Sequence, residues 1–263
     1  MVAGISSRFG GKIKQFAKVT DNETLIEYSI NQAIKSGFTK IIFIVGNKTE
    51  QPFKEKFKNS YKGIPIYYAL QKYDEITRDR PWGTTDALCS AKEIIKEPFV
   101  ICNGDDIYGE KAFEILFNHL KNSNEEAAPG YNLIKVIPET GKIHRGIFQI
   151  DKNDYVKSLK ETFNIEKSNL QATNTKPDDL CSMNIFALHP EIVKMLDEKL
   201  KIFKEKNKED RKIEFLLPSE ISNLIEEGKI KMKIYPCNEK WFGVTNPGDE
   251  DIIKQQLKNI LVS

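Results

Sequence analysis

The chain has 263 residues, 40% of them apolar and 30% charged, and its 40 basic and 38 acidic residues leave a net charge of +2. This near balance argues against a nucleic-acid coat or a membrane-surface protein, and no apolar run approaches the roughly 20 residues of a membrane span. The four cysteines form no CxxC pair, which predicts buried free thiols and argues against a zinc site or a disulfide framework. No signal peptide precedes the first loop, so we expect a cytoplasmic protein.

The first half of the chain alternates helix-like and strand-like segments. Apolar spacing and capping residues predict helices over 24–37, over 86–95 with Thr84 or Thr85 as cap, and over 110–121, and buried strands over 40–45, 63–70 and 99–103. This alternation predicts an α/β fold, a Rossmann-like three-layer α/β/α arrangement around a mixed sheet. Ligands of such sheets bind beyond the carboxyl ends of strands, so we expect the opening loop and the loop at Gly104–Gly109 to share one edge.

The second half predicts further strands of a mixed sheet, followed by helices. We expect strands over 131–136, 145–150, 155–161 and 180–188, an irregular loop over 164–179, and helices over about 190–206, 218–227 and 247–261. There is no internal repeat and no flexible linker. We therefore expect a single domain over 1–263, with a nucleotide-binding half of about 1–125 and an acceptor-binding half of about 126–263.

The opening stretch MVAGISSRFGGKIKQF has the composition of an anion-binding turn. Glycines at 4, 10 and 11 allow main-chain N–H groups to point at an anion, and Arg8 and Lys14 add two cations, so the loop suits a polyphosphate. It is not the G-x-G-x-x-G fingerprint, nor the P-loop, because Ile13 stands where the P-loop has Ser or Thr. The alternative is a plain strand-to-helix connection carrying surface lysines.

The acidic doublet of NGDDIYG follows the strand predicted over 99–103. Magnesium takes one or two carboxylates together with phosphate oxygens and water, and an acid beyond the end of a strand meets that need. On spacing alone, the doublet could equally form an ordinary Asx turn. Its expected place beside the cationic loop favours a metal site.

Several motifs in order resemble the nucleotidyltransferase superfamily, which includes the sugar-1-phosphate nucleotidylyltransferases. They are the opening A-G-x-x-S-R-F-G-G…K-Q pattern and the segments RPWGTTDAL, NGDDIYG and EKWFGVTNPGDEDI, and together they span essentially the whole chain. The resemblance implies transfer of NMP from an NTP to a sugar phosphate or similar phosphorylated acceptor, with release of pyrophosphate and with Mg2+ as cofactor.

The resemblance also implies roles for residues that bind the nucleotide and the metal. Arg8 would grip the triphosphate, Lys14 would stabilise charge on the reacting phosphates, and Asp105 would bind magnesium. Further nucleotide contacts are implied for Ala3, Gly4 and Ser6, and the segment RPWGTTDAL implies contacts with the base for Gly83 and Thr84, with Gln71 as a third candidate. Asp106 matches a variable polar position and could cap the turn.

On the acceptor side, the resemblance implies that Glu161 binds sugar hydroxyls and that Asn184 faces the acceptor. Trp82 is expected to pack at a strand-to-helix corner and not to stack on the base. Both acceptor-side residue types are also common on ordinary solvated strands.

Two departures from the family pattern bear on these expectations. Many members carry W-x-D-x-G near the C-terminus, whose aspartate is a second metal ligand, but here Gly243 takes that place and Asp249 is a poor substitute. Only three residues precede Gly4, so we expect the first strand to begin upstream of Met1.

Two rival functions remain open from the sequence. A nucleotide-sugar-dependent glycosyltransferase would also bind metal with aspartates but would release NDP. A catalytically inert nucleotide-binding module is made plausible by Gly243. For the nucleotidyltransferase the expected partners are an NTP and a small phosphorylated acceptor, with no nucleic acid and no membrane. The sequence leaves the base, the acceptor and the oligomeric state open.

Overall fold

The computed structural model describes residues 1–4, 10, 12–139, 141–244 and 248–262. Its helices are α1 (Leu25–Lys35), α2 (Glu50–Phe57), α3 (Thr84–Ser90), α4 (Glu110–Asn122), α5 (Leu133–Val136), α6 (Pro190–Lys206), α7 (Leu217–Glu226) and α8 (Asp249–Val262), with a 3-10 turn η2 (Lys14–Phe16). Its strands are β1 (Ile41–Val45), β2 (Ser60–Tyr61), β3 (Ile64–Leu70), β4 (Phe99–Ile101), β5 (Asp106–Ile107), β6 (Glu126–Asn132), β7 (Ile143–Ile150), β8 (Val156–Ile165), β9 (Leu180–Cys181), β10 (Phe186–Leu188), β11 (Met232–Cys237) and β12 (Phe242–Gly243).

The strands form a small sheet, a large sheet and a short ribbon. The small sheet has the order β1-β3-β2, and the large sheet has the order β4-β10-β6-β9-β7-β8, with β11 beside β6. In the large sheet β10 runs antiparallel to β4 and β6, whereas β11 runs parallel to β6. The predicted mixed α/β sheet is therefore confirmed. Because β4 pairs with β10, strands from both halves of the chain share one sheet.

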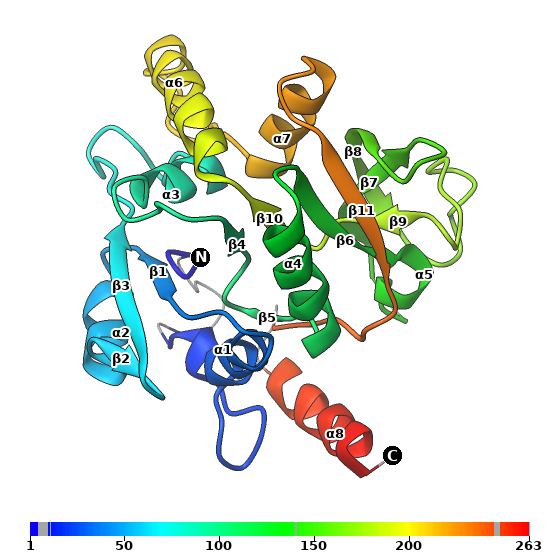
Figure 1. The fold of residues 1–263 in the computed structure, drawn as a ribbon, viewed down its shortest axis with the longest axis horizontal. Coiled ribbons are helices and arrows are strands. Elements are labelled where there is room, and N and C mark those ends of the chain that lie inside the picture. Colours follow the sequence, from blue (N-terminus) through cyan, green and yellow to red (C-terminus); the bar gives the residue numbers. More distant parts are fainter. Residues whose placement is uncertain (5–9, 11, 140, 245–247, 263) are drawn as a thin grey trace.

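Helices cover both faces of the large sheet, so the predicted three layers are also present (Figure 1). Along β10, Phe186 and Leu188 join one apolar cluster with residues of α3, α6 and α7. Ala187, which lies between them, joins a second cluster with residues of α4. Successive residues of a strand point to opposite faces, so these two clusters are the cores on the two sides of the sheet.

Most of the predicted elements are present near their predicted bounds. The helices over 24–37, 110–121 and 190–206 correspond to α1, α4 and α6, and the strands over 40–45, 63–70 and 145–150 to β1, β3 and β7. The helix expected over 86–95 begins earlier, at Thr84, and ends at Ser90. All four cysteines are free thiols, as predicted. No helix in the described ranges combines the length and apolarity needed to cross a bilayer.

The prediction of a strand over 131–136 was wrong. The strand is β6, Glu126–Asn132, and Leu133–Val136 forms the short helix α5. Pro129 and Gly130 in the middle of β6 are typical of a turn, because proline cannot donate to a strand ladder. Leu133 and Val136 are both buried, and their spacing of three residues suits one helical turn.

The strand predicted over 180–188 is interrupted. It consists of β9 and β10, and Asn184 between them has φ of 58°, a left-handed conformation that asparagine tolerates better than most residues. Among the longer elements, α2 and β11 had no predicted counterpart, and neither did the short elements η2, β2, β5 and β12. In β11 the alternate residues Met232 and Ile234 are buried, which is the period-two signal of a strand.

The first two residues lie between β1 and β4. Val2 N–H donates to the carbonyl of Ile44 at 2.8 Å, and the Met1 amino group donates to the carbonyl of Cys102 at 2.7 Å. Alternate residues of a strand turn their main-chain groups to the same side, so those of Ile42 and Val100 face the space behind Met1. That space is an apolar slot of about 130 Å³, lined by Ile42, Val100 and residues of α1, among others.

Adding a short apolar strand in front of Met1 is expected to stabilise the protein. Its amide would keep the bond to Cys102, and each apolar side chain buried in the slot stabilises by about 1.5–3 kcal/mol. Two such side chains predict a rise in Tm of about 5 °C or more, since 1 kcal/mol shifts Tm by roughly 2–4 °C at this size. A Gly-Ser extension of equal length is the control. Equal melting temperatures of the apolar and the Gly-Ser variants in calorimetry would contradict binding of an added strand in the slot.

Candidate functional site

A cavity of about 480 Å³ opens beyond the carboxyl ends of β3 and β4. Of the residues predicted for a nucleotide and metal site, it is lined by Ala3, Gly4, Lys14, Gln71, Gly83, Thr84 and Asp105. Ser6 and Arg8 lie outside the described residues. Seven predicted residues from four separate segments thus share one cavity wall, at the edge of the sheet where the fold class places ligands.

Lys14 and Asp105 are in direct contact as an ion pair. Lys14 belongs to η2, Asp105 follows β4, and the Lys14 ammonium also donates to the carbonyl of Val244 at 3.3 Å. The two side chains are only 21% and 25% exposed, so they are partly enclosed yet still reachable from the cavity. This contact joins the opening loop, the acidic turn and the segment around β12.

Glycine at 104 allows the opening segment to lie against the acidic turn. A Cβ at this position would lie 2.3 Å from Cγ1 of Val2, closer than any real Cβ contact. Gly104 N–H also donates to the carbonyl of Met1 at 2.8 Å. Any larger residue would push the first strand away from the turn that carries Asp105.

The segment predicted to recognise the base is held rigidly. Gly83 has φ of +100°, and a Cβ there would lie 2.6 Å from the carbonyl oxygen of Phe215, so this position requires glycine. The Thr84 hydroxyl accepts a hydrogen bond from Leu217 N–H at 2.8 Å. Buried Gln71 donates to the carbonyl of Gly83 at 3.0 Å and to Asp86 at 2.8 Å. The Gln71 amide nitrogen therefore has two hydrogen-bond partners within the protein.

Trp82 packs as predicted. The Arg78 guanidinium lies 3.4 Å from the centroid of its ring, and Phe203 meets the ring edge-on with centroids 6.1 Å apart. Arg78 in turn donates to the carbonyls of Asp210 and Ile213 at 2.7 and 2.6 Å. These contacts fix the loop before α3 against the segment that leads into α7.

Gln15 and Arg80 are among the cavity residues that were not predicted from the sequence. Gln15 is buried, lines the cavity, and its Oε1 has no hydrogen-bond partner in the described residues. Gln15 follows Lys14 in the K-Q pair of the opening pattern, and this position could have identified it as a site residue. Arg80 also lines the cavity and pairs with Glu214 at 3.0 Å. Arg80 opens the RPWGTTDAL motif, but its pairing with Glu214 forms only after folding.

The two acids of the doublet have different surroundings. Asp105 faces Lys14, whereas Asp106 is buried in β5 and accepts hydrogen bonds from Asn103 Nδ2 and the Tyr108 hydroxyl, each at 3.1 Å. Burial, together with the charge of Asp105, raises the pKa of Asp106 to about 7. Asp106 therefore organises the turn from inside it.

Gly243 leaves room for its neighbours. It pairs with Asp106 across β12 and β5, and a Cβ at 243 would lie 2.5 Å from the Trp241 ring and 2.8 Å from Asp106 Oδ1. The space that an aspartate would need here is filled. Among the described residues, no three His, Cys, Asp or Glu side chains gather into a metal cage. A single carboxylate on the cavity wall, Asp105, still fits an ion that takes its other ligands from phosphate and water.

The two predicted acceptor residues lie outside this cavity, Glu161 in β8 and Asn184 between β9 and β10. Glu161 of β8 pairs with Gly146 of β7, whose carbonyl accepts from Ser182 N–H at 2.8 Å. Asn184 N–H donates to the Ser182 hydroxyl at 3.2 Å. Partial desolvation raises the pKa of Glu161, and its exposed side chain stays open to solvent.

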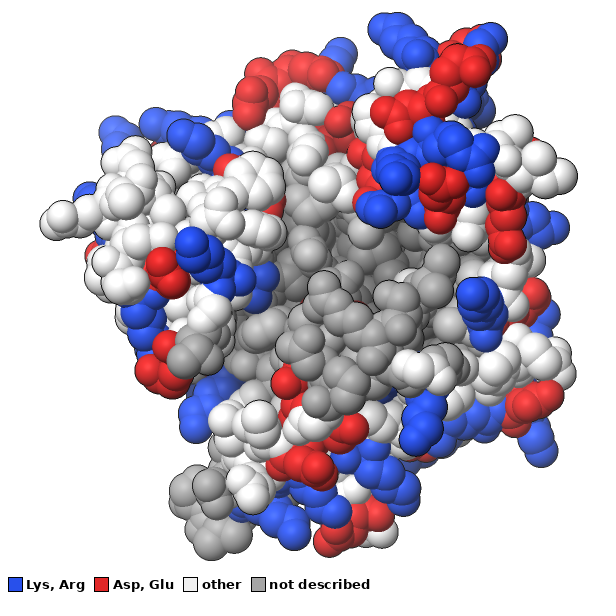
Figure 2. Space-filling view, turned by 180° about the vertical axis from the view of Figure 1, so that it is seen from behind, with Lys and Arg blue, Asp and Glu red and all other residues white. Residues whose placement is uncertain are grey.

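Charged side chains do not gather by sign on the face drawn in Figure 2. Basic and acidic residues are interspersed over the part of this face that is coloured by charge. The charge that matters for the site is therefore local, in side chains such as Lys14, Arg80 and Asp105.

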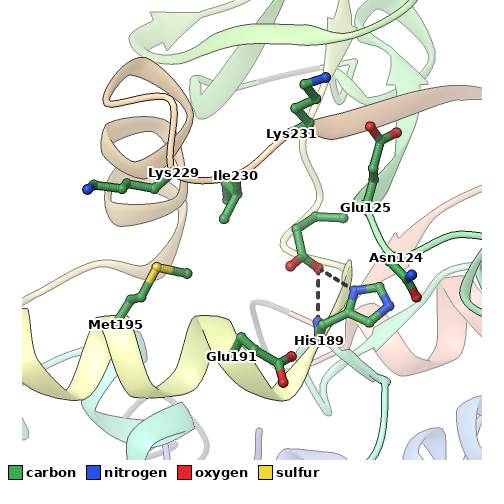
Figure 3. Close-up of a pocket in the computed structure, with 9 residues that line it drawn as sticks. Asn124, Glu125, His189, Glu191, Met195, Lys229, Ile230 and Lys231 are labelled. Atoms are coloured by element: carbon green, nitrogen blue, oxygen red, sulfur yellow. Dashed lines mark hydrogen bonds and ion pairs between the residues drawn. The ribbon is translucent and has the colours of Figure 1, made fainter.

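A second cavity of about 480 Å³ lies at the opposite edge of the large sheet, where β6 begins and β10 ends (Figure 3). Here Glu126 Oε2 accepts from His189 N–H at 2.9 Å and lies 3.2 Å from His189 Nδ1. Burial raises the pKa of Glu126 to about 8 and lowers the pKa of His189, so near neutral pH the two form a hydrogen bond between uncharged groups.

Comparison with protein families matches residues 10–249 to the family described as nucleotidyl transferase. No curated protein sequence matches the chain.

Among solved structures, the chain is similar to a UDP-glucose pyrophosphorylase in complex with UDP-glucose, with a TM-score of 0.68, 14% identity, and coverage of 98% of this chain and 97% of that one. It is similar to a Bacillus anthracis protein assigned as a glucose-1-phosphate thymidylyltransferase, with a TM-score of 0.71, 11% identity, and coverage of 98% and 93%. It is also similar to the inositol-1-phosphate CTP transferase of T. maritima, with a TM-score of 0.67, 12% identity, and coverage of 98% and 94%. At these identities the likeness establishes the fold.

Glu126→Gln is expected to remove one component of the pH dependence of stability. The pKa of Glu126 is about 8 in the folded protein against an ordinary value of 4.5, so between these pH values the folded state binds the extra proton. The free energy of unfolding then falls as pH rises, by up to about 1.4 kcal/mol per pH unit. Urea unfolding at pH 5 to 8 should show a flatter profile for the variant. Glu191→Gln, an exposed acid of the same cavity, is the control, and parallel profiles for wild type and Glu126→Gln would contradict the assignment.

Proposed function

Because the chain belongs to the nucleotidyl transferase family, we propose that it transfers NMP from a nucleoside triphosphate to a sugar phosphate or similar phosphorylated acceptor, releasing pyrophosphate. Family membership makes the chain a nucleotidyltransferase, and the substrate pair is the proposal. One observation supports it above the others, namely the contact between Lys14 and Asp105 on the wall of a shared cavity. Side by side, the cation can bind the phosphates of a triphosphate and the carboxylate can bind its metal ion.

The nucleotide would occupy the cavity beyond β3 and β4. The main-chain segment of Ala3 and Gly4 opens onto it, and Lys14 provides a positive charge for the phosphates. Ser6 and Arg8 would make further contacts with the phosphates. The base would lie at Gly83 and Thr84, whose loop is already fixed by Phe215 and Leu217. A loop that is rigid before binding loses little entropy when the nucleotide arrives.

Magnesium would bind at Asp105, which presents the predicted carboxylate to the cavity. When bound, the ion supplies charge neutralisation on the phosphate oxygens. In the ligand-free protein the Lys14 ammonium provides the positive charge beside Asp105. Asp106 stays in its hydrogen bonds with Asn103 and Tyr108 and holds the turn in place.

The reaction requires positioning more than proton transfer. An oxygen of the acceptor phosphate attacks the α-phosphorus, a new P–O bond forms, and the bond from the α-phosphorus to the bridging oxygen breaks to release pyrophosphate. The attacking oxygen is already anionic near neutral pH, so the site needs no strong general base. Lys14, with Arg8, would stabilise the charge that builds on the leaving pyrophosphate.

The two halves of the chain would divide the substrates. Residues of about 1–125 carry the nucleotide cavity, and residues of about 126–263 would bind the acceptor through Glu161 and Asn184. The pairing of β4 with β10 holds the two halves in one sheet. We also propose a cytoplasmic location, which four free thiols and the need for NTP support.

The test of this function is pyrophosphate release across a panel. Four NTPs are combined with Mg2+ and with glucose 1-phosphate, inositol 1-phosphate and phosphocholine, and pyrophosphate is measured by a coupled assay. We expect release with at least one pair and none when the acceptor or Mg2+ is omitted. Tight NTP binding with no release for any pair would indicate an inert binding module. NDP release from a nucleotide sugar would indicate a glycosyltransferase.

Lys14→Ala is expected to lower kcat by about 10²–10³-fold, because it removes a charge aimed at the reacting phosphates. The fold should persist, since a partly exposed ion pair contributes only about 0–1 kcal/mol. Lys18→Ala is the matched control, because Lys18 is exposed on the same segment and outside the cavity. Turnover of Lys14→Ala within a few-fold of wild type, at an unchanged melting temperature, would remove Lys14 from the mechanism.

A further inference from the structure

Arg145 is a cation that forms no ion pair with any of the residues that the structure describes. It lies in β7 opposite Thr162 of β8, and its Nη1 donates to the carbonyl of His144 at 2.9 Å. Its Nε is buried and has no hydrogen-bond partner in the described part of the chain, and no ion pair joins Arg145 to a described carboxylate within 4.0 Å. A partly buried guanidinium with an unsatisfied N–H is costly unless a ligand completes its contacts.

Trp241 is a second unsatisfied donor beside it. The Arg145 guanidinium carbon lies 5.2 Å from the centroid of the Trp241 ring, which is a cation–π contact. The Trp241 Nε1 is also buried and has no partner among the residues described. Two neighbouring side chains, both of which can only donate, therefore each hold a free N–H. Their common complement is an acceptor-only group, which means an oxyanion.

The position of this pair points to one group of the substrates. The Trp241 ring packs against Gly243, which pairs with Asp106 next to the proposed magnesium ligand. On its other side, Arg145 precedes Gly146, which pairs with Glu161. The pair thus lies between the acidic turn and the strands proposed to hold the acceptor. The acceptor phosphate that attacks the nucleotide must occupy the same interval.

The neighbouring acids do not satisfy Arg145. Asp106 accepts from Asn103 and Tyr108, and Glu161 makes no ion pair with Arg145 although it lies one strand away. The planar guanidinium suits phosphate in particular, because it presents several N–H groups in a fixed fork.

We infer that Arg145 and Trp241 bind the phosphate group of the acceptor and hold it for attack on the nucleotide. This inference rests on the proposed function and makes it more specific. The acceptor is anchored by its phosphate through the second half of the chain, and the nucleotide phosphates are bound separately through the first half. An acceptor that lacks the phosphate is not held.

The test measures binding directly. Inorganic phosphate, glucose 1-phosphate and inositol 1-phosphate are titrated by 31P NMR into the full chain saturated with Mg2+ and a non-hydrolysable NTP analogue. Arg145→Gln should weaken binding of the phosphate probes at least tenfold, Arg145→Lys should weaken it less, and Trp241→Phe about threefold. Lys157→Gln removes a charge from an exposed position of β8 and should leave the dissociation constants unchanged.

Kinetics with any pair that turns over provide a second readout. Arg145→Gln should raise the acceptor KM at least tenfold and leave the NTP KM within twofold. Failure of wild type to bind any phosphate probe, or equal binding by wild type and Arg145→Gln, would overturn the inference. An equal rise in both KM values would also overturn it, because Arg145 would then act on the nucleotide or on the fold. A protein that binds the probes through Arg145 but releases no pyrophosphate with any pair would leave the inference standing and refute the proposed function.

Discussion

The contact between Lys14 and Asp105 depends on how closely the first residues of the chain approach the turn after β4. The main-chain bonds of Met1 and Val2 to β4 and β1 set that approach, and Gly104 permits it because any Cβ there would strike Val2. A partly exposed ion pair is too weak to hold two segments together by itself. The main-chain bonds of the first residues therefore bring Lys14 and Asp105 together, and these two side chains place one positive and one negative charge on the cavity wall.

The proposed nucleotide and acceptor sides of the molecule are connected through one short ribbon, β5 and β12. β5 carries Asp106 next to Asp105, and β12 carries Gly243 opposite it, with the Trp241 ring filling the space above the glycine. Where other family members have an aspartate, Gly243 thus leaves no empty space, because the Trp241 ring and Asp106 fill it. Trp241 uses that space to reach Arg145, which connects the acidic turn to β7.

Much of the fold could be predicted from local patterns. Helices such as α1 and α6 have strong apolar spacing, and β1 is a continuous apolar run, so period and length decide them. The secondary-structure predictions that were wrong lie where pairing with neighbouring strands outweighs the local conformational preference of the residues. β6 tolerates Pro129 and Gly130 because β10, β9 and β11 surround it, and no local pattern reveals those pairings. The break at Asn184 similarly depends on the strands on either side.

The sequence by itself determined the class of fold and supplied the residue types proposed for the nucleotide site, because glycines, cations and acids at strand ends carry their chemistry in short local motifs. Only the tertiary structure decided which of them meet. It brought Lys14 to Asp105, added Gln15 and Arg80 to the same cavity, and set Arg145 against Trp241. Such contacts join segments far apart in the chain, and their distances follow from strand order and packing, which no short stretch of sequence encodes.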